Sequence, residues 1–157
     1  MKDLAINTTI QVAQLDELTD AEQSLLQQAI EGTRHSYAPY SRFHVGAAVL
    51  LENGMTLMGC NQENAAFSAG ICAERSAIFA AGVQYPDQAV RMLAIAAKNE
   101  QWELLDEPIT PCGTCRQVII EAETRFKKPI RILLYGRKYV YVIQGIRQLM
   151  PLSFSEF

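Results

Sequence analysis

The sequence lacks the features that would place the protein in a membrane, on a nucleic acid or outside the cell. No stretch approaches the roughly 20 apolar residues that cross a bilayer. A net charge of -3 and a pI near 5.4 give no basic surface for nucleic acid or an anionic membrane. The start of the chain lacks the charged-then-apolar order of a secretory signal. With no internal repeat or linker, we expect one cytoplasmic domain.

Cysteine and histidine are also scarce, with four and two residues in 157. Without a secretory signal, so few cysteines favour metal ligation over disulfides. Three of them fall in two short motifs, Cys72-Ala73-Glu74 and Pro111-Cys112-Gly113-Thr114-Cys115. A structural zinc site prefers four protein ligands, whereas a hydrolytic one keeps a coordination position free for water. Three cysteines beside a glutamate therefore predict a catalytic metal centre.

The order of predicted elements is that of an α/β protein. A capping-box pattern at Thr19 predicts the start of a helix. Pro39 predicts that this helix ends before the segment around it. Alternating apolar residues around the turn signal Asn53-Gly54 predict a hairpin over 43–60. After the hairpin we predict a helix over 73–81 that ends at Gly82, and then a strand at 92–97. A second helix over 115–123 follows, and after it come strands at 130–135 and 139–143. We therefore predict a single domain over residues 18–157, preceded by an extension over residues 1–17.

Both halves of the cysteine pattern lie where a predicted helix begins. The free N–H groups and positive dipole end of a helix N-terminus stabilise thiolates. Arg75 is expected to offset the negative charge of a three-thiolate site, unless it is an ordinary surface arginine. Glu74 either favours the helix dipole or takes and delivers a proton beside a metal-activated water. The joint presence of both cysteine motifs favours the second role.

The combination of a Cys-x-Glu and a Pro-Cys-x-x-Cys motif resembles the zinc deaminases of the cytidine/deoxycytidylate deaminase family. The resemblance is most specific to the small, three-cysteine cytidine deaminases that act on free nucleosides. It covers about residues 20–157. The motifs that carry it are Tyr40-Ser41-Arg42-Phe43-His44-Val45-Gly46-Ala47-Ala48, Asn61-Gln62-Glu63-Asn64-Ala65, Cys72-Ala73-Glu74-Arg75-Ser76-Ala77-Ile78 and Pro111-Cys112-Gly113-Thr114-Cys115-Arg116-Gln117.

The resemblance implies a three-layer α/β/α sandwich with a central mixed five-stranded sheet. It also implies hydrolysis of cytidine or 2'-deoxycytidine to uridine or 2'-deoxyuridine and ammonia, in pyrimidine salvage. One Zn²⁺ per subunit, a homotetramer and no nucleic-acid or membrane partner are expected. The implied residues are Glu74 as the catalytic acid–base; Cys72, Cys112 and Cys115 as zinc ligands; Phe43, Asn61, Glu63, Ala65 and Ala73 as substrate contacts; and Arg75 and Gln117 as supports of the ligand sulfurs. Phe67 stands where many relatives carry tyrosine.

Three other hypotheses fit parts of the sequence. A related deaminase would act on an aminopyrimidine antibiotic nucleoside or on a free base. A structural zinc module would use Cys60 as a fourth ligand, although Cys60 is more typical of a small buried apolar residue. A nucleic-acid editor is disfavoured by the acidic charge balance. His35 and His44 are expected to be structural or exposed, because neither lies at ligand spacing from the cysteines. Trp102, near acidic neighbours, is expected to anchor a surface loop.

Overall fold

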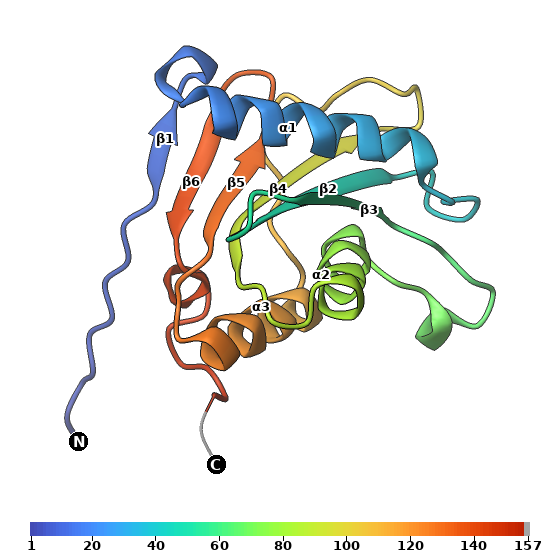
Figure 1. The fold of residues 1–157 in the computed structure, drawn as a ribbon. Coiled ribbons are helices and arrows are strands. Elements are labelled where there is room, and N and C mark those ends of the chain that lie inside the picture. Colours follow the sequence, from blue (N-terminus) through green and yellow to red (C-terminus); the bar gives the residue numbers. More distant parts are fainter. Residues whose placement is uncertain (156–157) are drawn as a thin grey trace.

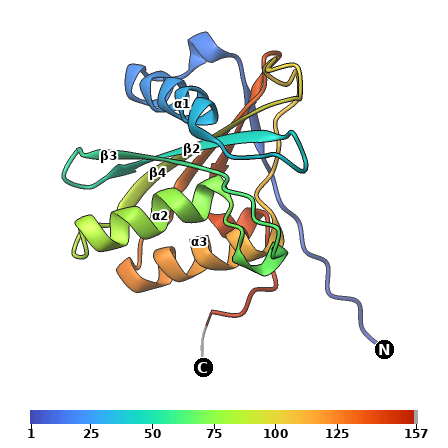
Figure 2. The same cartoon turned by 90° about the vertical axis from the view of Figure 1, so that its right-hand side faces the viewer.

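The computed structural model describes residues 1–155, so the last two residues of the predicted domain lie outside the described chain. A six-stranded mixed sheet carries one helix on one face and two on the other, which gives the three layers of Figures 1 and 2. The strands and helices are β1 (Gln11–Ala13), α1 (Asp20–Gly32), β2 (His44–Leu51), β3 (Thr56–Cys60), α2 (Ala73–Gln84), β4 (Val90–Lys98), α3 (Gly113–Phe126), β5 (Arg131–Tyr135) and β6 (Val140–Gln144). Within this described part, no helix is long and apolar enough to cross a membrane.

The strands lie in the order β1-β6-β5-β4-β2-β3. Strands β4 and β5 are parallel and are connected through α3, whereas every other neighbouring pair is antiparallel. The parallel pair follows from the helical crossover, because a crossover returns the chain to the end where the first strand began. The predicted mixed α/β/α architecture is confirmed.

The sheet has six strands rather than the five that we expected. The additional strand, β1, lies within the 1–17 segment and pairs with β6 in the register Gln11↔Val142 to Ala13↔Val140. It is three residues long, and its central Val12 is exposed. A strand this short and this exposed carries no alternating apolar pattern, so no local signal predicts it.

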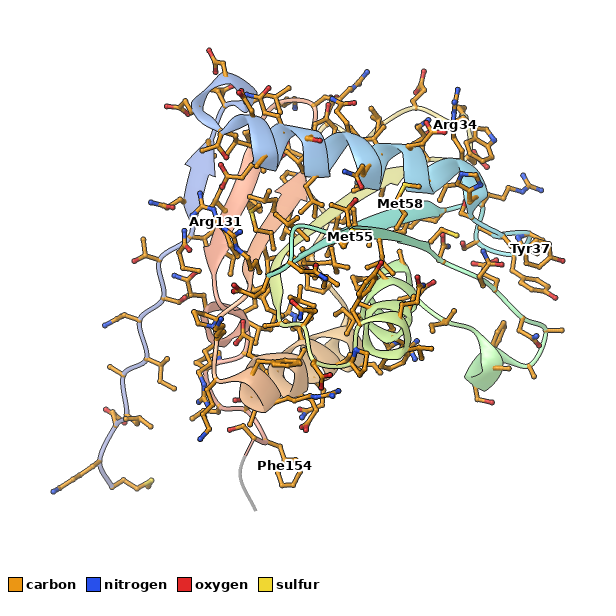
Figure 3. All side chains as sticks on the ribbon, in the orientation of Figure 1. Arg34, Tyr37, Met55, Met58, Arg131 and Phe154 are labelled. Atoms are coloured by element: carbon orange, nitrogen blue, oxygen red, sulfur yellow. The ribbon has the colours of Figure 1, made fainter. Side chains whose placement is uncertain are left out.

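Helix α1 covers one face of the sheet and begins at the predicted capping box. The Thr19 hydroxyl accepts from the backbone N of Glu22, and the Glu22 carboxylate accepts from the backbone N of Thr19. The same carboxylate pairs with Arg131 at the start of β5. Figure 3 labels Arg131 among the side chains of the sheet. Leu25 and Leu26 are fully buried beneath the helix, and each such side chain contributes about 1.5–3 kcal/mol.

Strand β2 is buried on both faces, because helices cover both sides of the sheet at this position. Ala47, Val49 and Leu51 pack with α2 and α3 in the larger core, while Ala48 packs in the smaller core beneath α1. The sheet therefore separates two apolar layers, and the layer that contains α2 and α3 is the one from which the cysteine motifs arise.

Helix α2 runs past its expected end at Gly82 and stops at Gln84. A Cβ placed on Gly82 would meet no atom within 4 Å, and its φ is not left-handed, so this glycine is an ordinary helical residue. The helix ends before Tyr85, whose backbone is non-helical and which precedes Pro86. Proline disfavours the helical conformation in the residue before it, so Pro86 ends the helix. The predicted end at Gly82 is therefore two residues too early.

Candidate active site

Three cysteine sulfurs meet where α2 and α3 begin. Cys72 is the residue before α2, Cys112 is the residue before α3, and Cys115 is buried in the first turn of α3. Their Sγ atoms all lie within 4.8 Å of one another, and the Cys72 and Cys112 sulfurs are 3.9 Å apart. The two helix starts bring together cysteines that are 40 residues apart in the sequence.

The sulfur cluster has the dimensions of a zinc site with one open position. Tetrahedral zinc with Zn–S bonds near 2.3 Å places its sulfur ligands about 3.8 Å apart. Across residues 1–155, no fourth metal-ligating side chain joins Cys72, Cys112 and Cys115 in such a group. Cys60 stands outside it, with its sulfur accepting from Gln62 Nε2 at 3.2 Å. The donor set fits one Zn²⁺ with a coordination position left for water.

Positive charge and hydrogen bonds favour the thiolate form of Cys72. Arg75 donates from its guanidinium to the Cys72 sulfur at 3.7 Å. Hydrogen bonds from Cys115 and then Arg75 lower the pKa of Cys72 to about 5, while the same coupling and burial raise the pKa of Cys115. Arg75 Nε is buried and has no hydrogen-bond partner within the described residues. The guanidinium is thus held beside the sulfurs rather than in solvent.

Glu74 is buried beside the cluster, one residue into the first turn after Ala73. Burial, followed by the negative charge of Cys72, raises the pKa of its carboxyl group. A carboxyl group in such a position holds a proton more readily than an exposed glutamate does. This property suits a group that takes a proton and later delivers it.

Two residues that the sequence interpretation missed position the metal motifs. Gly59 on β3 permits α2 to lie against the sheet, because a Cβ there would come within 2.4 Å of the Ala77 backbone nitrogen. Arg116 fastens the start of α3 by donating to the carbonyl oxygens of Pro111 at 2.8 Å and Leu149 at 2.7 Å. Both roles depend on contacts between distant segments, which no local motif signals.

The predicted substrate contacts Asn61 and Glu63 hold the 40–45 segment, which leads into β2 and contains Phe43. The Asn61 amide accepts from the backbone N of Val45 at 2.9 Å and donates to the carbonyl oxygen of Phe43 at 2.8 Å. The Glu63 carboxylate accepts from the backbone N of Tyr40 at 2.8 Å. Although desolvation raises the pKa of Glu63, its hydrogen bonds lower it by more, so the group is an ionised acceptor.

A cavity of about 260 Å³ connects Asn61 and Glu63 with one metal ligand, Cys72. It is lined by Tyr40, Asn61, Gln62, Glu63, Asn64, Phe67, Gly70, Ile71, Cys72 and Arg75. Phe67, in the short 3-10 helix Phe67–Ala69, is 85% exposed and meets Tyr40 edge to face, with ring centroids 6.5 Å apart. The cavity therefore has a metal ligand at one side and polar groups with an aromatic pair at the other.

The remaining predicted site residues are not among those that line this cavity. Phe43 is half-buried, Ala65 is exposed, and Ala73 is buried in the first turn of α2. Gln117 donates from Nε2 to the carbonyl oxygen of Phe154 at 2.8 Å, so its amide contacts the C-terminal segment where we expected a ligand sulfur. This contact fastens residues near the C-terminus, and the support of a ligand sulfur by Gln117 stays a prediction.

The fold and the site together define a class of protein, a metal-dependent hydrolytic enzyme on a three-layer α/β/α fold. Residues 19–128 match the family model for the cytidine and deoxycytidylate deaminase zinc-binding region. The chain belongs to this family. The three-cysteine cluster is accordingly a site for one Zn²⁺ per subunit.

Individual relatives agree with this assignment. The chain is 41% identical over 99 residues to a cytidine deaminase of Halalkalibacterium halodurans, covering 63% of this chain and 70% of that protein. It is 34% identical over 118 residues to a cytidine deaminase of Mycobacterium tuberculosis, covering 73% and 84%. The crystal structure of cytidine deaminase from Burkholderia pseudomallei superimposes with a TM-score of 0.73 at 33% identity, covering 87% of this chain and all of that one.

Proposed function

We propose that this protein catalyses the hydrolytic deamination of cytidine and 2'-deoxycytidine to uridine and 2'-deoxyuridine, with release of ammonia. The observation that carries the proposal is a buried glutamate beside a three-sulfur cluster with one open coordination position. Zinc held by Cys72, Cys112 and Cys115 supplies activation of water and stabilisation of negative charge. The relatives that match the chain carry the name cytidine deaminase.

Glu74 is the proposed proton carrier of the reaction. Its carboxylate takes a proton from the attacking water and gives it to the ring nitrogen next to the reacting carbon. A proton then passes through the same group to the exocyclic amine, which leaves as ammonia. The raised pKa that burial gives Glu74 supports both transfers, because the group holds a proton more readily between accepting and delivering it.

The proposed nucleoside site uses the 40–45 segment and its neighbours. Phe43 stacks on the pyrimidine, and Asn61 and Glu63 bind the ribose hydroxyls, while backbone groups near Ala65 and Ala73 help to place the sugar and base. Asn61 keeps a second hydrogen on Nδ2 and a second lone pair on Oδ1 beyond its two backbone bonds. The ionised Glu63 would repel a nearby phosphate, which favours an unphosphorylated substrate.

Arg75 is the proposed support of the metal centre in this reaction. Three thiolates around one Zn²⁺ leave a net negative charge, which lowers the acidity of a bound water. The guanidinium contact with the Cys72 sulfur withdraws part of that charge. The expected support from Gln117 is indirect, since its amide holds the segment at Phe154.

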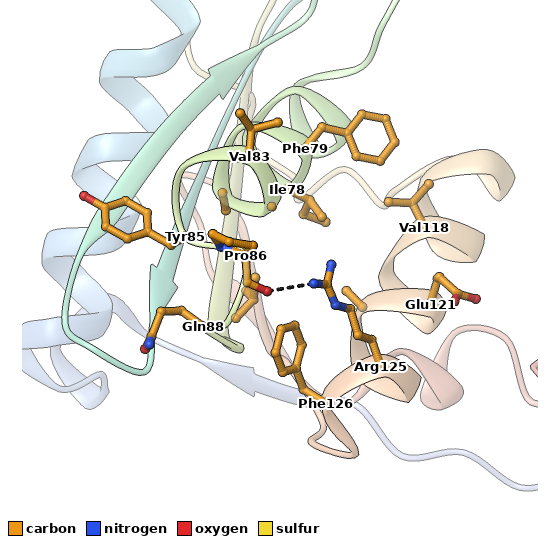
Figure 4. Close-up of a pocket in the computed structure, with 14 residues that line it drawn as sticks. Ile78, Phe79, Val83, Tyr85, Pro86, Gln88, Val118, Glu121, Arg125 and Phe126 are labelled. Atoms are coloured by element: carbon orange, nitrogen blue, oxygen red, sulfur yellow. Dashed lines mark hydrogen bonds between the residues drawn. The ribbon is translucent and has the colours of Figure 1, made fainter.

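We propose a homotetramer, and an apolar groove supports an association between copies. The groove, about 460 Å³, lies between the C-terminal halves of α2 and α3 (Figure 4). Arg125 crosses it to donate to the carbonyl oxygen of Pro86 at 2.7 Å. Phe79 and Val83 on α2 are exposed at its rim, Val83 by 82%. Exposed apolar surface of this kind is typical of protein contacts.

We also place the protein in the cytoplasm. All four cysteines lie in the described chain as free thiols, and three of them form the metal site. A reducing compartment keeps such thiols available for zinc.

The test is ultraviolet-monitored turnover of cytidine by the purified protein, with and without a zinc chelator. We expect activity that the chelator removes and added Zn²⁺ restores. Parallel assays with cytosine, deoxycytidine monophosphate and blasticidin S distinguish a nucleoside enzyme from its relatives. Turnover of one of these in place of cytidine would contradict the proposed substrate, and activity that survives complete zinc removal would contradict the metal chemistry.

A further inference from the structure

The 99–105 loop, which leaves β4 and leads toward α3, is a rigid turn. The Asn99 side chain accepts from the backbone N of Gln101 and of Glu103, each at 3.0 Å. The backbone N of Leu105 donates to the carbonyl oxygen of Ala97 at 3.2 Å, which fastens the end of the loop to β4. Side chains that this loop presents are therefore fixed relative to the sheet.

The loop contacts the 40–45 segment twice. The Trp102 ring stacks on the His44 ring, with centroids 3.8 Å apart and planes inclined by 20°. Glu100 forms an ion pair with Arg42 at 3.6 Å. Trp102 and Arg42 have φ values of 63° and 55°, which are uncommon for residues with side chains. Such conformations persist where the surrounding contacts impose them.

The His44 ring is fixed on a second side by Ser36. The Ser36 hydroxyl donates to the carbonyl oxygen of Thr33 at 2.8 Å and lies 2.7 Å from His44 Nδ1. Because the only hydroxyl hydrogen is already donated to Thr33, Nδ1 must carry a proton and donate it to Ser36 Oγ. The buried imidazole therefore has one orientation, set by a stack on its face and a hydrogen bond at its edge.

Fixing His44 also orients Phe43. Successive side chains of an extended chain point to opposite faces, and Val45 packs in the core beneath α2 and α3, so His44 lies on the α1 side. We infer from the same alternation, carried one residue back from the start of β2, that Phe43 faces the α2 side. The Asn61 amide holds the Phe43 carbonyl oxygen from the cavity side. The 40–45 segment is thus held between Asn61 and Glu63 on one flank and the 99–105 loop on the other.

We propose that Trp102 and His44 are positioning residues for nucleoside binding, through which the 99–105 loop sets the orientation of Phe43. This inference rests on the proposed function, because Phe43 matters here as the residue that stacks on the pyrimidine. Neither Trp102 nor His44 touches the nucleoside. Their effect passes through the backbone of the 40–45 segment, so it falls on substrate binding and leaves the metal chemistry unaltered.

The test compares Trp102→Ala, Trp102→Phe and the loop-matched control Glu103→Gln. Loss of an aromatic stack changes an equilibrium by about two- to tenfold, so we expect Trp102→Ala to raise KM for cytidine by that factor. The value of kcat and the zinc content should stay within about twofold of the parent. Trp102→Phe retains a stacking ring and should restore KM. Trp102→Leu provides the same comparison if the alanine variant does not fold.

Hydrogen exchange gives an independent readout of the same contact. The backbone amides of Tyr40, Ser41 and Val45 should exchange faster in Trp102→Ala, and at the parent rate in Glu103→Gln. An unchanged KM in Trp102→Ala, or a loss of kcat together with a loss of zinc, would overturn the inference. The proposed function would stand in that case, provided that the parent protein turns over cytidine. If the parent does not turn over cytidine, the proposed function fails, and unchanged exchange in the 40–45 segment would then overturn the positioning role separately.

Discussion

At the scale of single residues, the four cysteines divide into three that meet and one that lies apart. Cys72, Cys112 and Cys115 form the cluster, whereas the Cys60 sulfur accepts from Gln62. We expect Cys60→Ser to retain one zinc per chain and Cys112→Ser to lose it, because only the second substitution removes a ligand. Metal analysis after gel filtration measures this. Zinc loss in Cys60→Ser would instead support a closed, four-cysteine structural site.

Glu74 provides the sharpest separation of chemistry from structure. Glu74→Gln keeps the size and most hydrogen bonds of the side chain but cannot carry a proton. We expect zinc content and melting temperature near those of the parent, with kcat lower by about 10²–10⁴-fold. Glu31→Gln, on the exposed surface of α1, is the matched control and should keep full turnover. Substantial activity in Glu74→Gln would refute the proton-carrier role.

The part of the candidate site that could be predicted from the sequence is the part whose chemistry is local. Three cysteines at two helix starts and a neighbouring glutamate can be read from two short motifs. Arg116 and Trp102 act through contacts with residues more than 30 and 50 positions away, and a single sequence does not indicate such contacts. Gln117 shows the same limit, since its partner Phe154 lies in the C-terminal segment.

At the scale of elements, two glycines test how closely α2 must lie against the sheet. A Cβ on Gly59 would approach the Ala77 nitrogen to 2.4 Å, so Gly59→Ala must displace α2 from β3. We expect a loss of about 1–3 kcal/mol in unfolding free energy and weaker zinc binding. Gly82→Ala, within α2 and free of steric contact, should gain about 0.5–1 kcal/mol. Urea unfolding measures both, and equal effects of the two substitutions would contradict this packing.

Helix α1 is expected to confer a pH-dependent part of the stability. Desolvation raises the pKa of Glu22, but its hydrogen bonds with Thr19 and its pairing with Arg131 outweigh this and lower it below 4.5. The ionised group therefore stabilises the fold above its unfolded pKa, and this contribution is lost as pH falls through the lower folded value. Glu22→Gln should cost about 1–2 kcal/mol near pH 7.

The difference between Glu22→Gln and the parent should shrink as pH falls below 4.5. Chemical unfolding at a series of pH values measures this difference. Glu31→Gln is the control, because its exposed pair with Arg34 should contribute little at any pH. A difference that grows in acid would show that Glu22 stabilises α1 in its protonated form.

Element types could be predicted from periodicity, and element ends depended on what lies next to them. The capping box at Thr19 and the turn at Asn53-Gly54 act within a few residues, and the structure contains both. The end of α2 was placed at Gly82, although Pro86 two residues beyond Gln84 provides the stop. Strand β1 forms by pairing with the edge strand β6. A three-residue segment contains no local pattern that indicates such a distant partner.

At the scale of the whole molecule, the groove between α2 and α3 tests the proposed assembly. Val83→Asp places a charge on an exposed apolar rim that we propose is covered by another copy. We expect the variant to sediment as a smaller species than the parent while remaining folded. Val12→Asp changes another exposed valine, on β1, and is the control that should not change the assembly. An unchanged sedimentation coefficient in Val83→Asp would exclude this groove from the interface.

Arg116 gives the chain a thermodynamic connection between its metal centre and its far end. One guanidinium holds Pro111, beside a ligand, and Leu149, which leads into the C-terminal segment. Thermodynamic coupling between metal binding and docking of the C-terminal segment is reciprocal. If docking of the segment raises the affinity for the metal by some factor, the bound metal raises the docking equilibrium constant by the same factor. Binding of the metal would thus change the order of a segment that is well separated in sequence from every residue that ligates the metal.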